Sequence, residues 1–154
     1  IKKIDASIEK WQIDDILVSR LKMNHPGGGS SYRLDANGKS LVYLTDNELY
    51  PPYAKATDFQ EFAEFAKDTD LLIHDAQYLI SDMPAKAGWG HSVAEEAVKL
   101  AMACGAKQVA LYSHDPSRTD KDIDNIVEHS KLIIELGGAS AVCFGAKENQ
   151  QVQL

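Results

Sequence analysis

Residues 40–46 read Ser-Leu-Val-Tyr-Leu-Thr-Asp, an alternating run of strand-forming residues that ends on a carboxylate. This pattern predicts a strand. The Asn-Gly pair at 37–38 precedes it and is typical of a two-residue turn, which predicts a hairpin with a strand at 31–35. Further along, the capped apolar stripe at 57–67 predicts a helix, and the buried run at 70–78 predicts the next strand. A hairpin followed by helix–strand units predicts an α/β fold with helices packed on a mixed sheet.

The remaining segments continue this order, and we expect a single domain over residues 1–154. Residues 1–15 are charged and lack a clean period, so we expect an arm or a short helix there. We also expect capping boxes formed by Thr57 with Gln60 and by Ser92 with Glu95. The predicted strands are 16–23, 31–35, 40–45, 70–78, 108–113 and 141–144, and the predicted helices are 57–67, 92–104 and 119–136.

Acidic or imidazole side chains lie at the ends of four predicted strands. His25, Asp46 and His114 come just after a strand, and Asp75 ends the apolar part of the run at 70–78, which continues into a loop. Strand ends in α/β folds converge on one edge of the sheet, and ligands bind at that edge. Imidazole and carboxylate together suit zinc, iron or manganese. The sequence therefore predicts a metal site at this edge.

Each of these residues alone also fits a simpler interpretation. A histidine in a Gly/Pro loop is often a surface residue, Asp46 fits a turn, and His114 fits an ordinary strand-to-helix turn. His91 also fits a residue that only flanks a helix. His74 and Asp75 are neighbours on one strand, so they point to opposite faces, and one of them should face the core or the helix layer.

Five short motifs occur in order between about residues 16 and 120. They are His-Pro-Gly-Gly-Gly-Ser-Ser-Tyr-Arg at 25–33, Val-Tyr-Leu-Thr-Asp at 42–46, Leu-Leu-Ile-His-Asp-Ala at 71–76, Gly-His-Ser at 90–92 and Tyr-Ser-His at 112–114. Together they resemble the metallo-β-lactamase superfamily of metal-dependent hydrolases. The resemblance is to its phosphodiesterase branch, which includes ribonuclease Z and the phosphonate-pathway cyclic phosphodiesterase. The motifs at 71–76 and 90–92 resemble the His-Glu-Ala and His-Ser-Thr motifs of that branch.

The resemblance implies that the chain forms the C-terminal half of an αββα sandwich. The sequence departs from the family in two respects. The signature His-x-His-x-Asp-His, which supplies most metal ligands in the N-terminal half of the family's fold, is absent from this sequence. Residue 1 is Ile rather than Met, so we expect a fragment of a larger hydrolase. In addition, Asp75 stands where ribonuclease Z has Glu, and the shorter side chain places its role in question.

The resemblance also implies roles for five residues. His25 and His114 would each help to hold one of two divalent metals, and Asp46 would bridge them. His91 would give a proton or a hydrogen bond to the phosphate or the leaving oxygen, and Asp75 would orient His91. Zinc is the first expectation for the metals, with manganese or iron as alternatives. These three ligands are too few for a tight dinuclear centre, so we expect weak or partial occupancy and an inactive chain on its own.

Composition sets limits on partners and location. The net charge of −7 disfavours broad nucleic-acid binding and leaves small phosphodiesters open as substrates. No run is long and apolar enough for a membrane span, and two cysteines are too few for a disulfide framework, so we expect a cytoplasmic location. Loss of one half of the sandwich would bare the inner face of the sheet, which predicts pairing with the missing half or with a second copy.

Three other interpretations remain open at this point. The same fold also hydrolyses other substrates, such as a thioester, a lactone or a β-lactam. A non-catalytic binding or regulatory module would have lost the metal-rich half. A flavodoxin-like domain would place a glycine-rich phosphate loop before a helix, but Gly27-Gly28-Gly29 leads into a predicted strand.

Overall fold

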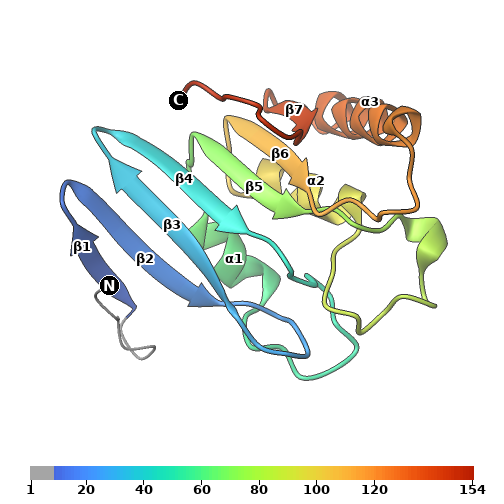
Figure 1. Ribbon diagram of the computed structural model, residues 1–154, viewed down its shortest axis with the longest axis horizontal. Coiled ribbons are helices and arrows are strands. Elements are labelled where there is room, and N and C mark those ends of the chain that lie inside the picture. The colour runs from blue at the N-terminus through green and yellow to red at the C-terminus, as the bar shows by residue number, and fades with distance from the viewer. Residues whose placement is uncertain (1–8) are drawn as a thin grey trace.

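Seven strands pair in the order of the chain and form one sheet, one strand more than predicted (Figure 1). The sheet is mixed, as predicted. The computed structural model describes residues 9–154. Strands β1 to β4 pair antiparallel, and β4 to β7 pair parallel. The elements are β1 (Lys10–Ile13), β2 (Ile16–Lys22), β3 (Ser30–Ala36), β4 (Lys39–Leu44), α1 (Phe59–Phe65), β5 (Leu71–Asp75), the 3₁₀ turn η1 (Ile80–Asp82), α2 (Ala94–Ala103), β6 (Gln108–Tyr112), α3 (Asp120–Leu136) and β7 (Val142–Gly145).

The predicted strands and helices are all present, with boundaries that differ by a few residues. The Asn37-Gly38 turn joins β3 to β4, and both residues have positive φ, of 52° and 72°. The N-terminal prediction was incomplete, because residues 10–13 form the edge strand β1. Residues 1–8 of that predicted arm or helix lie outside the described residues. The strand predicted at 70–78 ends at Asp75.

Both predicted capping boxes were wrong. Helix α1 begins one residue later than the Thr57 box requires, because Asp58 caps it and exchanges hydrogen bonds with Glu61. The Thr57 hydroxyl instead donates to the Lys22 carbonyl, at 2.7 Å. Ser92 precedes the N-cap of α2, and its side chain bonds to a neighbouring loop rather than to the helix. Hydroxyl groups that resemble caps in the sequence therefore serve tertiary contacts.

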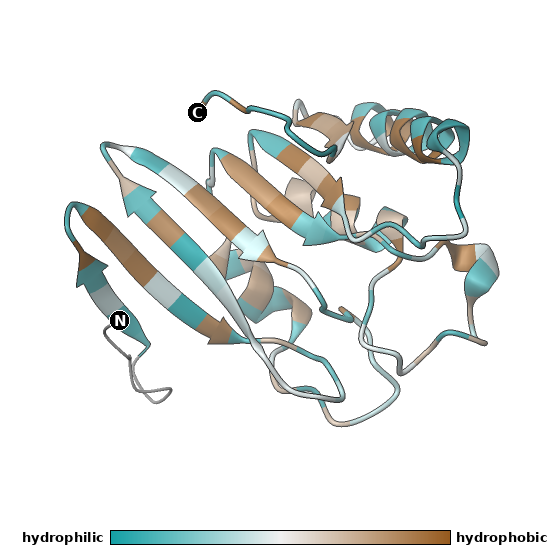
Figure 2. Ribbon diagram, viewed as in Figure 1, coloured by the Kyte–Doolittle hydropathy of each residue, from teal (hydrophilic) through white to brown (hydrophobic). Residues whose placement is uncertain are grey.

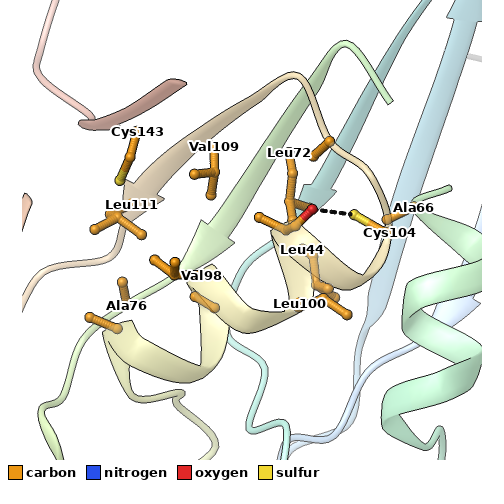
Figure 3. Close-up of a cluster of buried hydrophobic side chains, with 14 of the residues drawn as sticks. Leu44, Ala66, Leu72, Ala76, Val98, Leu100, Cys104, Val109, Leu111 and Cys143 are labelled. Atoms are coloured by element: carbon orange, nitrogen blue, oxygen red, sulfur yellow. Dashed lines mark hydrogen bonds between the residues drawn. The ribbon is translucent and has the colours of Figure 1, made fainter. Parts of the chain in front are cut away.

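The three helices cover one face of the sheet. Their apolar residues join the inward side chains of the strands in one cluster, and Figure 3 shows its part around α2. Cys104 and Cys143 are buried in this cluster as free thiols, and burial raises the pKa of each to about 11. None of the helices in residues 9–154 is long and apolar enough to cross a membrane.

The opposite face of the sheet carries no helix (Figure 1). Side chains alternate along a strand, so the neighbours of the core residues point to this open face. Several of them are large and aromatic or aliphatic. Figure 2 shows the apolar residues of the strands interrupted by polar ones. Trp11 meets Tyr32 edge-on, and Tyr43 lies beside Tyr112, with ring centroids 6.2 and 6.1 Å apart. Tyr32, Tyr43 and Tyr112 are between 37% and 42% exposed. We define the open face by these residues together with Ile13, Leu41, Ile73, Val142 and Phe144.

A buried carboxylate joins three segments at the end of the sheet remote from the predicted metal site. Asp70 accepts a hydrogen bond from the Ser40 backbone N–H at 2.8 Å and from the Lys107 ammonium at 2.8 Å, and Lys39 lies 3.8 Å away. The contacts with Lys107 and Ser40 hold the pKa of Asp70 below its ordinary value of 3.8. Asp70 therefore links β4, β5 and the start of β6.

We expect the Asp70→Asn variant to be less stable than the parent chain at pH 7. Because the native pKa lies below the unfolded value, the charged carboxylate stabilises the fold above pH 3.8. This contribution is lost as the pH falls through the native pKa. Urea unfolding at pH 7 and at pH 3 should show the difference narrowing in acid. Asp124→Asn, which changes an exposed carboxylate of α3, is the control. A gap of equal size at both pH values would contradict the prediction.

Candidate functional site

Asp75 is the last residue of β5, and its carboxylate is fully buried. One oxygen accepts hydrogen bonds from the backbone N–H groups of Ser92 at 3.0 Å and Gln77 at 3.2 Å. The other oxygen accepts from the Asp46 N–H at 3.1 Å and lies 2.5 Å from the His91 Nδ1. Four donors occupy the four lone-pair directions of an ionised carboxylate, which offsets the cost of burying its charge. The shorter Asp side chain thus reaches His91.

His91 lies in the loop before α2 and is held from several sides. Because an ionised carboxylate only accepts, the His91 Nδ1 donates to Asp75, and this contact leaves the Nε2 unused. The Asp75 hydrogen bond raises the pKa of His91 above its ordinary value, although burial acts in the opposite direction. The Asp46 carboxylate lies 4.0 Å from the same nitrogen. Tyr78 packs edge-on against the ring.

Two residues directly beyond parallel strands have left-handed backbones at this edge of the sheet. Asp46 follows Thr45 after the end of β4 and has φ of 53°, and Ser113 follows β6 and has φ of 57°. Such conformations are unfavourable for residues other than glycine, and they concentrate at functional sites. The Asp46 side chain is exposed, whereas its backbone N–H is bound by Asp75. The conformation therefore fixes the backbone and directs the carboxylate outward.

His25 lies in the β2–β3 loop and meets His91 edge-on, with ring centroids 5.9 Å apart. Gly90 passes directly behind the His25 ring, and a Cβ atom at Gly90 would lie 2.2 Å from the His25 Cδ2. The His25 Nδ1 accepts a hydrogen bond from the Gly27 N–H at 3.1 Å. In the neutral ring the proton then sits on Nε2, so ligation by His25 requires the ring to turn over or to release Gly27.

His114 lies two residues beyond Tyr112, which pairs with Asp75 across β5 and β6. Both ring nitrogens of His114 are buried, and neither meets the geometry of a hydrogen bond to another described residue. Burial lowers the pKa of His114, although the nearby Leu111 backbone acts in the opposite direction, so the lowered pKa favours the neutral ring that a metal ligand requires. His74, by contrast, is fully buried on the helix side of β5, and its Nδ1 lies 2.6 Å from the Asp75 carbonyl oxygen.

Two buried polar residues that support this edge were missed at the sequence level. Asn24 binds the backbone of Glu48, Ala56 and Thr57 through its side chain, with distances of 2.8 to 3.2 Å. The Glu48 carboxylate accepts hydrogen bonds from the N–H groups of Gly88 at 2.8 Å and Gly90 at 3.0 Å. Both side chains join loops that are distant in sequence, so no local pattern predicts their role. The one available signal was that they lie close to His25 and Asp46 in the chain.

The predicted ligands His25, Asp46 and His114 have the chemistry of metal ligands, but of the three only Asp46 belongs to a close group of possible ligands among the described residues. Among residues 9–154, the ligand atoms of Asp46, Asp75 and His91 lie within 4.8 Å of one another. The Asp75 oxygens already accept four hydrogen bonds, so Asp75 has no free lone pair with which to ligate a metal. The trio is better suited to binding a proton on His91. The exposed Asp46 carboxylate and the buried His114 nitrogens are the donors that a metal would use directly.

Comparison with known proteins gives the family. The family model described as "Beta-lactamase superfamily domain" matches residues 10–114. The ribonuclease Z of Thermoplasma volcanium is 33% identical over 98 residues, which cover 60% of this chain and 29% of that protein. The ribonuclease Z of Halobacterium salinarum is 38% identical over 89 residues, which cover 58% and 26%. The chain therefore spans less than a third of these curated relatives.

Solved structures confirm the fold. The metallo-beta-lactamase fold protein YhfI from Bacillus subtilis superposes with a TM-score of 0.67 at 22% identity, over 90% of this chain and 49% of that chain. Human tRNase Z, short form, gives a TM-score of 0.55 at 18% identity, over 72% and 42%. The seven-stranded mixed sheet with three helices thus matches about half of a metallo-β-lactamase fold, as the sequence predicts.

We expect Gly90→Ala to destabilise the chain and displace the His25 ring. The added Cβ atom would overlap the ring, and overpacking of this kind costs roughly 1–3 kcal/mol. Gly38→Ala is the matched control, because Gly38 also has a positive φ but open space around its Cβ position. Urea unfolding and the NMR signals of the His25 ring measure the two effects. Equal losses of stability and unmoved His25 signals in both variants would refute the expectation.

Proposed function

The chain belongs to the beta-lactamase superfamily, and on that premise we propose that it is the metal-dependent, phosphodiester-hydrolysing part of a larger enzyme. The observation that carries the proposal is the buried Asp75–His91 pair, whose atoms lie 2.5 Å apart beside the exposed carboxylate of Asp46. A histidine held in this way is suited to proton transfer at neutral pH. The similarity to ribonuclease Z supports phosphodiesters as the substrate class.

Three residues of this chain would hold the metals. We assign one metal each to His25 and His114, and Asp46 to both. Zinc is the first choice, since imidazole and carboxylate ligands suit it, and manganese or iron are alternatives. When bound, such a metal pair supplies a hydroxide nucleophile near neutral pH and neutralises the charge of the phosphate.

His91 and Asp75 would handle the proton. The raised pKa of His91 favours its charged form, in which Nε2 donates to the phosphate or to the leaving oxygen. Asp75 fixes the ring by binding Nδ1 and stabilises the charge that the ring carries. His91 is thus the proposed catalytic residue, and Asp75 is a positioning residue.

We further propose that these 154 residues form a partial site. The family signature that supplies most ligands is absent from the sequence, and the described residues offer one histidine for each metal and a shared carboxylate. The expected behaviour is weak or partial metal occupancy and little or no turnover by this chain alone. The additional ligands would come from the other half of the family fold.

The open face supports the same proposal. Aromatic and aliphatic side chains of this face are exposed, among them Tyr43 at 38% and Val142 at 60%. In the family's sandwich this face would pack against the second sheet, which is the proposed partner of this chain. We also propose a small phosphodiester substrate, given the net charge of −7, and a cytoplasmic location, which the free thiols of Cys104 and Cys143 support.

The assignment of metal ligands is tested by titration with Zn²⁺ or Mn²⁺ after chelation and desalting. We expect Asp46→Asn and His114→Gln to weaken binding about tenfold or more, because each removes a direct ligand. His129→Gln is the matched control, since His129 is an exposed histidine of α3. Calorimetry measures the affinity, and elemental analysis gives the metal content of each chain.

The outcomes separate the parts of the proposal. Equal affinities for His114→Gln and His129→Gln would refute the metal site. Full occupancy by two metals with turnover of bis-p-nitrophenyl phosphate would support the hydrolase and contradict a partial site. Turnover of a thioester or lactone in place of the phosphodiester would change the substrate class.

Because the proposed partner sheet is absent from a solution of this chain alone, we expect self-association through the open face. Light scattering at increasing concentration should show species larger than a monomer, and Tyr43→Lys should shift them toward the monomer. Lys99→Glu, at an exposed position on α2, provides the control. A clean monomer at high concentration would count against the proposed role of this face.

A further inference from the structure

His74 is the titratable side chain of β5 that the proposed mechanism leaves unused. It is fully buried, and it pairs in register with Leu44 of β4 on one side and with Leu111 of β6 on the other. Both leucines belong to the hydrophobic core. An apolar side chain would suit this position, so the imidazole breaks the local pattern of the strand. Such breaks are expected at functional or strained sites.

The His74 ring uses one of its two nitrogens. Nδ1 lies 2.6 Å from the Asp75 carbonyl oxygen, which only accepts, so Nδ1 carries the proton of the ring. Burial lowers the pKa of His74, although this hydrogen bond acts in the opposite direction, and the lowered pKa favours the neutral ring. Nε2 is then a bare acceptor that makes no hydrogen bond among residues 9–154. An unsatisfied buried acceptor is costly, so the contact with Asp75 is what offsets the cost of the ring.

The carbonyl that His74 binds belongs to the peptide unit at the end of β5. The N–H of the same unit, which is that of Ala76, donates to the Tyr112 carbonyl of β6 at 2.9 Å. A peptide unit is planar, so hydrogen bonds at its two ends fix its orientation. The next N–H along the chain, that of Gln77, donates to the Asp75 carboxylate at 3.2 Å. The unit therefore connects the Cα atom of Asp75 to one of the donors of its own side chain.

The same carboxylate holds the proposed catalytic histidine. One Asp75 oxygen lies 2.5 Å from the His91 Nδ1 and also accepts from the Asp46 N–H at 3.1 Å. A hydrogen bond weakens steeply when its direction changes, so this contact depends on the direction in which the Asp75 side chain leaves β5. Rotation of the peptide unit after Asp75 would displace the Gln77 N–H and loosen the carboxylate.

We infer that His74 is a positioning residue for the Asp75–His91 pair. Its Nδ1–H fixes the peptide unit at the end of β5, and through that unit it fixes the carboxylate that orients His91. His74 itself transfers no proton to substrate, because its ring has no exposed surface. The inference deepens the proposed function, since it rests on His91 and Asp75 as the groups that handle the proton.

The test is NMR spectroscopy of the chain in EDTA at constant pH. It follows the His91 Nδ1 proton and the amide signals of Asp46 and Ser92, which bind the Asp75 carboxylate. His74→Leu removes the donor and suits the apolar surroundings. We expect this variant to keep the stability of the parent chain in urea unfolding, whereas the His91 Nδ1 proton exchanges with water about tenfold faster or more and the two amide signals shift.

Two amide variants separate the hydrogen bond from the packing. His74→Asn is the rescue variant, because its side-chain N–H lies near the position of the Nδ1 atom, and we expect parent-like signals. His74→Gln is its matched control, since it carries the same group one methylene further out, where it does not reach the Asp75 carbonyl. This pair keeps the test decisive even if His74→Leu does not fold.

Leu72→Val is the packing control. Leu72 is a fully buried apolar residue of the same strand and belongs to the hydrophobic core. We expect this variant to lose stability and to leave the His91 Nδ1 proton unchanged.

The outcomes decide the inference in the following way. Faster exchange of the His91 proton in His74→Leu and His74→Gln, but not in His74→Asn or Leu72→Val, would support it. Unchanged His91 signals in all variants at position 74 would show that His74 only fills the core. Equal effects in His74→Asn and His74→Gln, or in Leu72→Val and His74→Leu, would also overturn it. Neither metal nor substrate is present, so these results are independent of the metal titration and the turnover that test the proposed function.

Discussion

The buried carboxylate of Asp75 is the constraint on which the proposed site depends. A charge with no exposed surface is tolerated only when its lone pairs are all satisfied, and here the donors come from the β4 loop, the segment after β5 and the loop before α2. These three segments must therefore lie close together around the Asp75 carboxylate. As a result the backbone of Asp46 and the ring of His91 are fixed by the same side chain. The geometry of the site follows from satisfying this one carboxylate.

The parallel half of the sheet provides the rest of the arrangement. Strands β4, β5 and β6 run in one direction, so the residues that follow each of them meet at one edge. Alternation along β5 sends His74 into the helix layer and leaves Asp75 at the site, although the two are neighbours in the chain. The left-handed backbones at Asp46 and Ser113 then turn the chain sharply at the strand ends. One face of the sheet thus packs into the hydrophobic core, and the residues at the ends of its parallel strands form the proposed site.

The sequence predicts what depends on local pattern. Alternating runs located six strands, the Asn37-Gly38 pair located the hairpin, and strand ends located Asp46, Asp75 and His114 at one edge. It misassigned Thr57 and Ser92, because a hydroxyl before a helix resembles a cap whether it bonds to that helix or to a distant loop. Asn24 and Glu48 were missed for the same reason, because their partners lie twenty or more residues away in the chain. Hydrogen bonds between side chains and distant loops leave no recognisable pattern in the neighbouring sequence.

The distribution of charge suggests how a phosphate could approach so acidic an edge. Asp46, Asp75 and Glu48 lie close together there, and their charge repels an anion at the point where the proposed reaction occurs. Metal ions held at Asp46 would offset that repulsion, so the proposed reaction depends on the metal before the phosphate can reach His91.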